Sequence, residues 1–208
     1  DVDIISLSLG GNPEDGMSNL QSGTVEAVNE ALDAGIFVVA AAGNNGKEST
    51  INDVSIPANI LGVIAVGAST SDGSIWANSS IGSAIDPYSS EERSFPNQKP
   101  EVTAPGVRMF STASTEITPQ YAYSTGTSDS TVIVVGALAL ILQIHGDAMQ
   151  GADGNFDNKE MTKVKRALAN SSLDGQLEDS THSNKAGYGE LDAVAWLEEI
   201  KIEFNLDK

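Results

Sequence analysis

Short apolar runs alternate with longer amphipathic stretches along the chain, which is the pattern of strands that alternate with helices. Residues 4–9 (Ile-Ile-Ser-Leu-Ser-Leu) are nearly all apolar and are followed by Gly10 and Gly11, which predicts a strand buried on both faces. Residues 36–42 (Ile-Phe-Val-Val-Ala-Ala-Ala) predict a second strand of the same kind.

An amphipathic helix is expected between these two strands. Polar residues fill one face, Ser18 is the expected N-cap, and Gly35 is the expected end. The apolar residues of the other face recur at helical spacing: Leu20, Val25, Val28 and Leu32. A strand, a helix and a second strand in succession predict two parallel strands joined by a crossover helix. Further strands are expected at residues 63–68, 101–104 and 107–111, and further helices at 128–143, 159–170 and 191–199.

The helix at 128–143 is apolar on nearly every side, so we expect it in the interior, with Gly136, Ala137 and Ala139 allowing neighbours to approach closely. The predicted fold is therefore α/β, a three-layer sandwich with a mostly parallel sheet flanked by helices. We expect one domain over residues 1–208, since 208 residues suffice for one buried core and are few for two.

Composition and charge exclude several functions. With 11 basic and 29 acidic residues the net charge is -18, which opposes binding to nucleic acid phosphates. Cysteine is absent, which excludes disulfides, thiolate metal sites and cysteine nucleophiles. The longest apolar run, residues 132–142, is shorter than the ~18 residues of a membrane helix, so no membrane span is expected.

Three glycine-containing segments either follow a predicted strand or begin the buried helix, and we expect them to meet at one edge of the sheet. They are residues 8–11 (Ser-Leu-Gly-Gly), 41–46 (Ala-Ala-Gly-Asn-Asn-Gly) and 126–128 (Gly-Thr-Ser). Ligands of parallel α/β sheets bind at the carboxyl ends of strands, where the first two segments fall. Ser128 can expose its hydroxyl there or act as an ordinary helix cap, and Asn44 can donate to an oxyanion or simply form a turn.

Taken together, these segments resemble the subtilisin-like serine proteases, or subtilases, in order and spacing. Residues 5–11 are similar to the family's substrate-binding strand, and residues 38–44 to the strand that leads to its oxyanion asparagine. Later segments agree in order: 63–68 after Pro57, 99–106 (Lys-Pro-Glu-Val-Thr-Ala-Pro-Gly), 126–128, and 187–193 (Gly-Tyr-Gly-Glu-Leu-Asp-Ala).

The resemblance implies acyl transfer with Ser128 as the nucleophile and Asn44 as the donor to the tetrahedral oxyanion. It also implies that backbone groups bind an extended peptide substrate, at Ser8, Leu9, Gly10, Ala42 and Gly43. By the same resemblance the protein is expected to be secreted or extracytoplasmic. Its expected partners are a polypeptide substrate and a propeptide or further N-terminal segment.

The family's Asp and His motifs are not found in these residues. His145 is interpreted as a residue near a helix C-terminus, and His182 as a solvated loop residue. The first strand begins close to Asp1, so we expect the N-terminal elements of the domain to be missing. After Ser128 the family continues with Met-Ala, whereas this chain has Asp129, whose negative charge would disfavour an alkoxide-like transition state.

Residues 153–158 (Asp-Gly-Asn-Phe-Asp-Asn) have the spacing of the first three ligands of a calcium-binding loop, but the twelfth position is Val164 rather than Glu. Two interpretations stay open, a calcium site and an Asx-rich turn that caps the next helix. No cofactor is otherwise indicated, and no matched motif assigns metal ligands.

Two hypotheses of function follow. The first is the C-terminal part of a serine endopeptidase domain, with Asp and His supplied by an absent upstream segment. The second is a catalytically inactive subtilase-like pseudoprotease, which keeps the peptide-binding groove as a binding or structural module.

Overall fold

Four parallel strands form the central sheet, in the order β1 (Ile4–Leu7), β2 (Phe37–Ala41), β3 (Ile64–Ser69) and β4 (Val102–Pro105). The computed structural model describes residues 2–11, 19–46, 53–114, 116, 120–172 and 182–206. Leu7 pairs with Ala40, and Ala41 pairs with Val66, so the carboxyl ends of the first three strands lie at the same edge. The predicted parallel sheet is confirmed.

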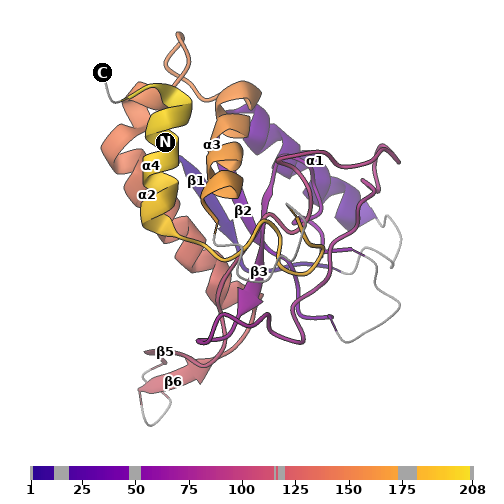
Figure 1. Ribbon diagram of the computed structural model, residues 1–208. Helices are drawn as coiled ribbons and strands as arrows, with labels where there is room; N and C mark the ends of the chain where they lie inside the picture. The colour runs from indigo at the N-terminus through magenta and orange to yellow at the C-terminus, as the bar shows by residue number, and fades with distance from the viewer. Residues whose placement is uncertain are drawn as a thin grey trace.

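Helices flank this sheet on both sides (Figure 1). Helix α1 (Asn19–Asp33) connects β1 to β2, and its Val28 and Leu32 are buried, as the spacing predicts. The expected cap at Ser18 lies outside the described residues. On the other side α2 (Thr127–Met149) packs against all four strands, while α3 (Asn158–Ser171) and α4 (Ala193–Phe204) pack on each other. The three-layer α/β fold is thus confirmed.

The interior is built on β2 and β3, whose residues are buried on both faces. Strand β1 differs, because Ile4, Ile5 and Leu7 are only half-buried and Ser6 is exposed. The prediction that β1 is buried on both faces is therefore wrong. It is the outer strand of the sheet, and no strand pairs with its other edge in the described part of the chain.

Residues 107–111 do not join the main sheet, contrary to the prediction. Strand β5 (Met109–Thr112) instead pairs antiparallel with β6 (Tyr121–Ser124), and the two form a hairpin that projects from the body of the protein (Figure 1). The hairpin carries exposed aromatic rings in mutual contact, with Phe110 5.5 Å from Tyr121 and 5.2 Å from Tyr123 between ring centroids.

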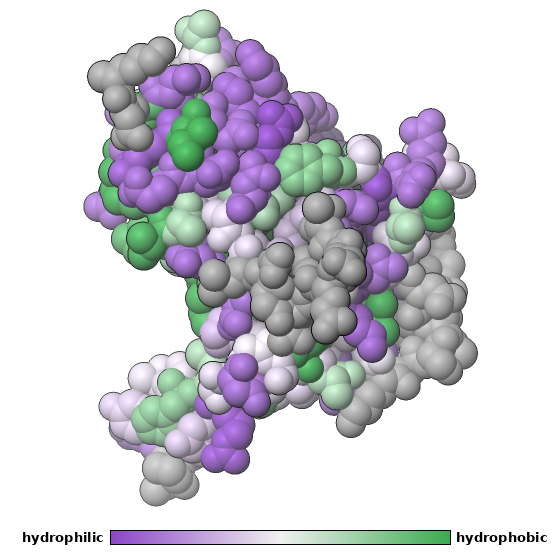
Figure 2. All heavy atoms as spheres, in the orientation of Figure 1, coloured by the Kyte–Doolittle hydropathy of each residue, from purple (hydrophilic) through white to green (hydrophobic). Residues whose placement is uncertain are grey.

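Helix α2 is only partly buried, which corrects the prediction of a helix enclosed by protein layers. Val134, Leu138 and Ile141 pack into the core, whereas Val132, Leu140 and Ile144 are each more than half exposed. Figure 2 shows hydrophobic side chains at the surface where α2 runs. By length and composition alone α2 could also cross a membrane, which the apolar run 132–142 did not indicate, but here it packs on the sheet.

A buried group of charges joins the start of β4 to α3. Oε1 of Glu101 lies 2.8 Å from Nζ of Lys99 and 2.8 Å from Nζ of Lys165, and Oε2 accepts a hydrogen bond from the Ala65 N–H at 2.7 Å. Burial disfavours the charged form of both lysines. It lowers the pKa of Lys99 to about 7, against the opposing effect of Glu101, and it also lowers the pKa of Lys165.

Candidate active site

Ser128 is the second residue of α2 and lies beside the end of β1. Its Oγ donates a hydrogen bond to the Ser8 carbonyl oxygen at 3.3 Å, and the Ser8 hydroxyl donates to the Ser128 carbonyl at 3.2 Å. Gly126 is the N-cap and makes no side-chain cap, so Ser128 is not the capping residue. The half-buried hydroxyl is therefore available for chemistry at the positive end of a long helix.

Asn44 follows β2 and is oriented by Thr127. Oδ1 of Asn44 accepts hydrogen bonds from the Thr127 N–H at 3.0 Å and from the Thr127 hydroxyl at 3.1 Å. The same hydroxyl oxygen accepts from the Gly43 N–H at 3.1 Å, and Thr127 is fully buried. Because the amide oxygen of Asn44 accepts from Thr127, the Nδ2 group of Asn44 is the end of the amide that can donate to another group.

A pocket of about 290 Å³ brings these residues together. Its lining comes from the ends of β1 and β2 and from the start of α2: Ser8, Leu9, Gly10, Ala41, Gly43, Asn44, Asn45, Ser55, Thr127 and Ser128. The predicted meeting of the three glycine-containing segments at one edge of the sheet is therefore confirmed. Ser8, Leu9 and Gly10 are exposed beyond the end of β1, where an extended chain can reach their backbone.

Two glycines of the pocket make room for Ser55. A Cβ at Gly10 would lie 2.7 Å from the Ser55 Cβ, and one at Gly43 would lie 2.2 Å from the Ser55 Oγ. Gly43 also has φ near +106°, a conformation that side chains disfavour. The backbone therefore passes Ser55 as closely as it does only because both residues are glycine.

Ala42 does not lie where the prediction puts it. Its side chain is fully buried, its N–H donates to the Val66 carbonyl at 2.9 Å, and its carbonyl accepts from the Ser55 N–H at 2.8 Å. Both backbone groups are thus already used within the fold. Ala41 lines the pocket instead.

Neither histidine is near Ser128. His145 is 17 positions further along α2, a distance of about 26 Å at 1.5 Å per residue. Nε2 of His182 is hydrogen-bonded to the Pro100 carbonyl at 3.0 Å. Pro100 lies just before β4, so this contact is at the amino ends of the strands, the edge of the sheet opposite Ser128. The His182 ring packs on Tyr188, and burial lowers its pKa, so the prediction of a solvated loop residue is wrong.

Asp129, next to Ser128, is hydrogen-bonded to the β5–β6 hairpin. Its Oδ2 accepts a hydrogen bond from the Ser124 hydroxyl at 2.9 Å, and the residue is half-buried. A carboxylate in the first turn favours the helix through the helix dipole. The same negative charge lies one residue from the candidate nucleophile.

The comparison with sequence families identifies this arrangement. The sequence model of the "Subtilase family" matches residues 1–189 of the 208-residue chain. The chain belongs to the subtilase family. Among its relatives, Subtilisin DY of Bacillus licheniformis is 38% identical over 141 residues, which are 68% of this chain and 43% of that protein. An extracellular protease of Xanthomonas campestris is 32% identical over 155 residues, which are 73% of this chain and 23% of that protein.

Solved structures agree with the fold expected of a subtilase. The patellamide maturation protease PatA superposes with a TM-score of 0.66 at 25% sequence identity, over 97% of this chain and 63% of that chain. The prenylagaramide maturation protease PagA, at 23% identity, shares the fold with a TM-score of 0.67, over 95% of this chain and 61% of that one. The chain spans less than half the length of Subtilisin DY.

Sequence reasoning assigned no role to Thr127 or Ser55. Thr127 belongs to the Gly-Thr-Ser segment, so its place beside Ser128 was a usable signal, but its bond to Asn44 joins residues 83 positions apart. No local pattern marks Ser55, which is buried beneath Gly10 and Gly43.

Proposed function

We propose that the protein to which this chain belongs is a serine endopeptidase that hydrolyses peptide bonds through an acyl-enzyme on Ser128. Membership of the subtilase family supports serine endopeptidase activity in general. The observation that supports the specific assignment is that Ser128 and Asn44 line one pocket, while Thr127 engages the amide oxygen of Asn44. A nucleophile and a preorganised N–H donor are the two groups that acyl transfer places around one carbonyl.

In this proposal an extended substrate lies along residues 8–10 and Gly43. The Ser128 Oγ attacks the scissile carbonyl carbon, its proton passes to a base, and the carbonyl oxygen becomes an oxyanion that accepts a hydrogen bond from Asn44 Nδ2. Collapse of this intermediate breaks the C–N bond, and the base returns the proton to the leaving amine. Water then hydrolyses the ester on Ser128 by the same steps.

The base is proposed to come from a segment upstream of Asp1, which would supply the Asp and His of the family. In the structure Ser128 Oγ donates to a carbonyl, and neither His145 nor His182 lies near it. A serine hydroxyl without a base is a weak nucleophile. The described part of this chain alone is therefore expected to be inactive.

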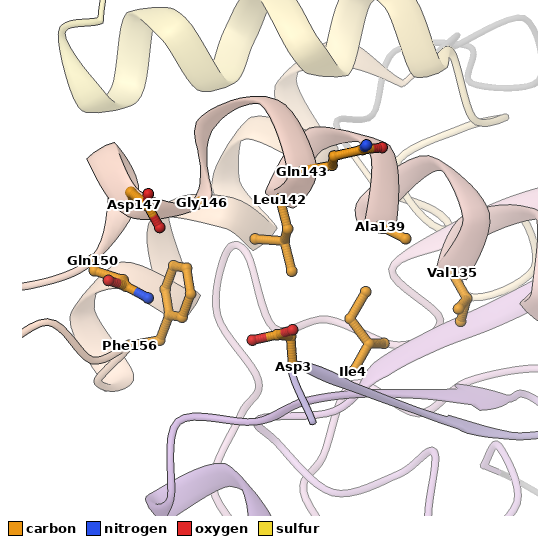
Figure 3. A pocket seen from close by; sticks show the side chains of 10 residues that line it. All are labelled: Asp3, Ile4, Val135, Ala139, Leu142, Gln143, Gly146, Asp147, Gln150 and Phe156. Atoms are coloured by element: carbon orange, nitrogen blue, oxygen red, sulfur yellow. The ribbon is translucent and has the colours of Figure 1, made fainter. Parts of the chain in front are cut away.

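The free side of β1 and α2 is the surface on which such a segment would pack. A pocket of about 490 Å³ lies between the start of β1 and the second half of α2. Figure 3 shows Leu142 pointing toward Asp3 and Ile4 across it, with the Phe156 ring at the end of the pocket near Gln150. An added strand beside β1 would complete its hydrogen bonds, and apolar side chains would cover Leu140 and Ile144.

The second candidate is an inactive subtilase-like protein that binds peptides without cutting them. The observation that favours it is Asp129, whose half-buried carboxylate adjoins Ser128. The groove residues would then bind an extended peptide through their backbone groups alone.

A fluorophosphonate probe applied to the full-length protein distinguishes these candidates. The endopeptidase proposal expects one equivalent of label on Ser128 and none on the Ser128→Ala variant. Ser8→Ala is the matched control, because it removes a neighbouring hydroxyl and is expected to keep the label. Intact peptide binding without labelling would overturn the endopeptidase proposal and support the second candidate.

Localisation and partners are proposed by relationship. The relative from Xanthomonas campestris is described as an extracellular protease, which supports an extracytoplasmic location for this protein. The substrate is proposed to be a polypeptide, and a propeptide is a further proposed partner.

A further inference from the structure

The connection between α2 and α3 contains acidic side chains whose positions the fold fixes. Oδ1 of Asp157 caps α3 by accepting from the N–H groups of Lys159 at 2.7 Å and Glu160 at 3.2 Å. Oδ1 of Asp153 accepts from the Asn155 N–H at 3.1 Å. The capping interpretation of the sequence is thus confirmed, and it leaves the other carboxylate oxygens of Asp153 and Asp157 to be accounted for.

Glu160 is the unusual member of this connection. It is only 7% exposed, although it is a carboxylate, and its buried Oε2 has no hydrogen-bond partner in the structure. Its carboxyl group lies beside that of Asp157. A buried carboxylate oxygen without a partner is costly, and a bound cation would satisfy it.

The unpartnered oxygen lies near Gly151. The position that a Cβ would take at Gly151 lies 3.2 Å from Asp153 Oδ1, 3.4 Å from the Asn155 carbonyl oxygen and 3.8 Å from Glu160 Oε2. Oxygen atoms from three residues therefore surround the position that a Cβ would take at Gly151, and one of them, the Asn155 carbonyl oxygen, also accepts the Gly151 N–H at 2.7 Å. The three nearest atoms are all oxygens, which favours a hard cation.

We propose that the position beside Gly151 binds a calcium ion, with Asp153, Glu160 and the Asn155 carbonyl as protein ligands. Calcium accepts mixed carboxylate, carbonyl and water oxygens in flexible geometry, whereas magnesium demands a near-ideal octahedron. The described residues contain no group of three acidic, cysteine or histidine side chains that could hold a metal, so the proposed site has two carboxylates and needs the carbonyl and water as further ligands. The net charge of -18 adds a general attraction for cations.

The role assigned to the ion is to stabilise the turn between α2 and α3. It is independent of peptide hydrolysis, since these residues lie at the end of α2 remote from Ser128. The competing explanation is a hydrogen bond between the side chains of Glu160 and Asp157, which satisfies the same carboxyl groups without a metal. The two explanations differ in their response to calcium.

Thermal unfolding of the full-length protein tests the proposal, in a Ser128→Ala background that prevents self-digestion. A site with a Kd of about 10⁻⁴ M, at ~10 mM calcium chloride, is expected to raise the midpoint by about 5–10 °C. Magnesium chloride at equal ionic strength is the reference. Because calcium could also bind elsewhere, the decisive comparison is the loss of part of this shift in Glu160→Gln and Asp153→Asn.

Glu198→Gln is the matched control, because it removes one charge from an exposed side chain of α4 and is expected to keep the full shift. Terbium luminescence titration provides a second readout, with one site fewer in both test variants. Should Glu160→Gln fail to fold, the exposed Asp153 still gives the answer. Equal calcium shifts in the wild type and both test variants would overturn the proposal.

Discussion

The Thr127 hydroxyl donates to Asn44 Oδ1 across 3.1 Å and so determines which end of the Asn44 amide is available to a substrate. The hydroxyl oxygen of Thr127 also accepts a hydrogen bond from the Gly43 N–H at 3.1 Å. One buried side chain therefore fixes the loop after β2 relative to the start of α2. The donor of the proposed oxyanion site is thereby held before any substrate binds, which is the condition under which such a donor is most effective.

Replacing Thr127 by Val is expected to lower kcat by about tenfold with little change in KM, because the amide of Asn44 loses one of its two fixed partners. The effect should be smaller than the ~10²- to 10³-fold loss on removing the whole donor, a range measured in subtilisin itself. Steady-state hydrolysis of a peptide by the full-length protein measures it. Thr127→Ser restores the hydroxyl and should restore kcat, and equal rates for Val and Ser would contradict this role.

Asp129→Asn is expected to raise kcat/KM about 3- to 10-fold, because a negative charge one residue from the proposed nucleophile is removed. The amide oxygen of the introduced side chain can still accept the Ser124 hydrogen bond that Asp129 accepts at 2.9 Å. Stability should fall by about 0.5 kcal/mol, because the helix N-terminus loses a favourable charge. Ser124→Ala keeps the charge and should leave kcat/KM low, so a similar gain in that variant would argue against the electrostatic explanation.

Gly43→Ala is expected to destabilise the fold by about 2 kcal/mol or more, since φ near +106° and a Cβ 2.2 Å from Ser55 Oγ both oppose a side chain. Urea unfolding in a Ser128→Ala background measures the change. Gly23→Ala is the matched control, because Gly23 lies inside α1 and a Cβ added there would meet no atom within 4 Å apart from its chain neighbours and the nearby backbone of its own helix. It should stabilise by ~0.5–1 kcal/mol, and similar effects of both substitutions would refute the steric argument.

Lys99→Met is expected to flatten the dependence of stability on pH. The folded pKa of Lys99 is lowered from 10.5 to about 7, so between these values the unfolded chain binds more protons than the folded one. Stability therefore rises with pH as Lys99 loses its buried charge, by about 2–3 kcal/mol between roughly pH 6 and pH 9 from this group alone. Chemical unfolding of both proteins at the two pH values gives the difference, and parallel slopes would exclude Lys99 as its source.

Much of the site could be predicted because strand ends are legible in sequence. Gly10 and Gly43 follow apolar runs, parallel strands end at a common edge, and Ser128 begins a helix that must pack on that sheet. Ala42 could not be separated from Ala41, since both follow the same run and only the hydrogen bonds to Val66 and Ser55 distinguish them.

The surroundings of α2 were harder to predict. A helix that is apolar all round indicates burial on all sides but not which neighbours provide it, so Leu140 was expected inside and is exposed. Strand β6 has four exposed residues and no buried face, so it gave no apolar alternation to recognise. The contact of Glu160 with the turn before α3 likewise depends on the fold rather than on ligand spacing.

The position of Glu101 between Lys99 and Lys165 bears on how subtilases of this kind can be recombined. The buried carboxylate of Glu101 forms ion pairs with two ammonium groups that are 66 positions apart in the sequence (165 minus 99). A chimaera that takes β4 from one parent and α3 from another would leave a buried charge without its counterpart unless both parents carry all three residues. Crossover points are therefore best placed before residue 99 or after residue 165, so that Lys99, Glu101 and Lys165 come from the same parent.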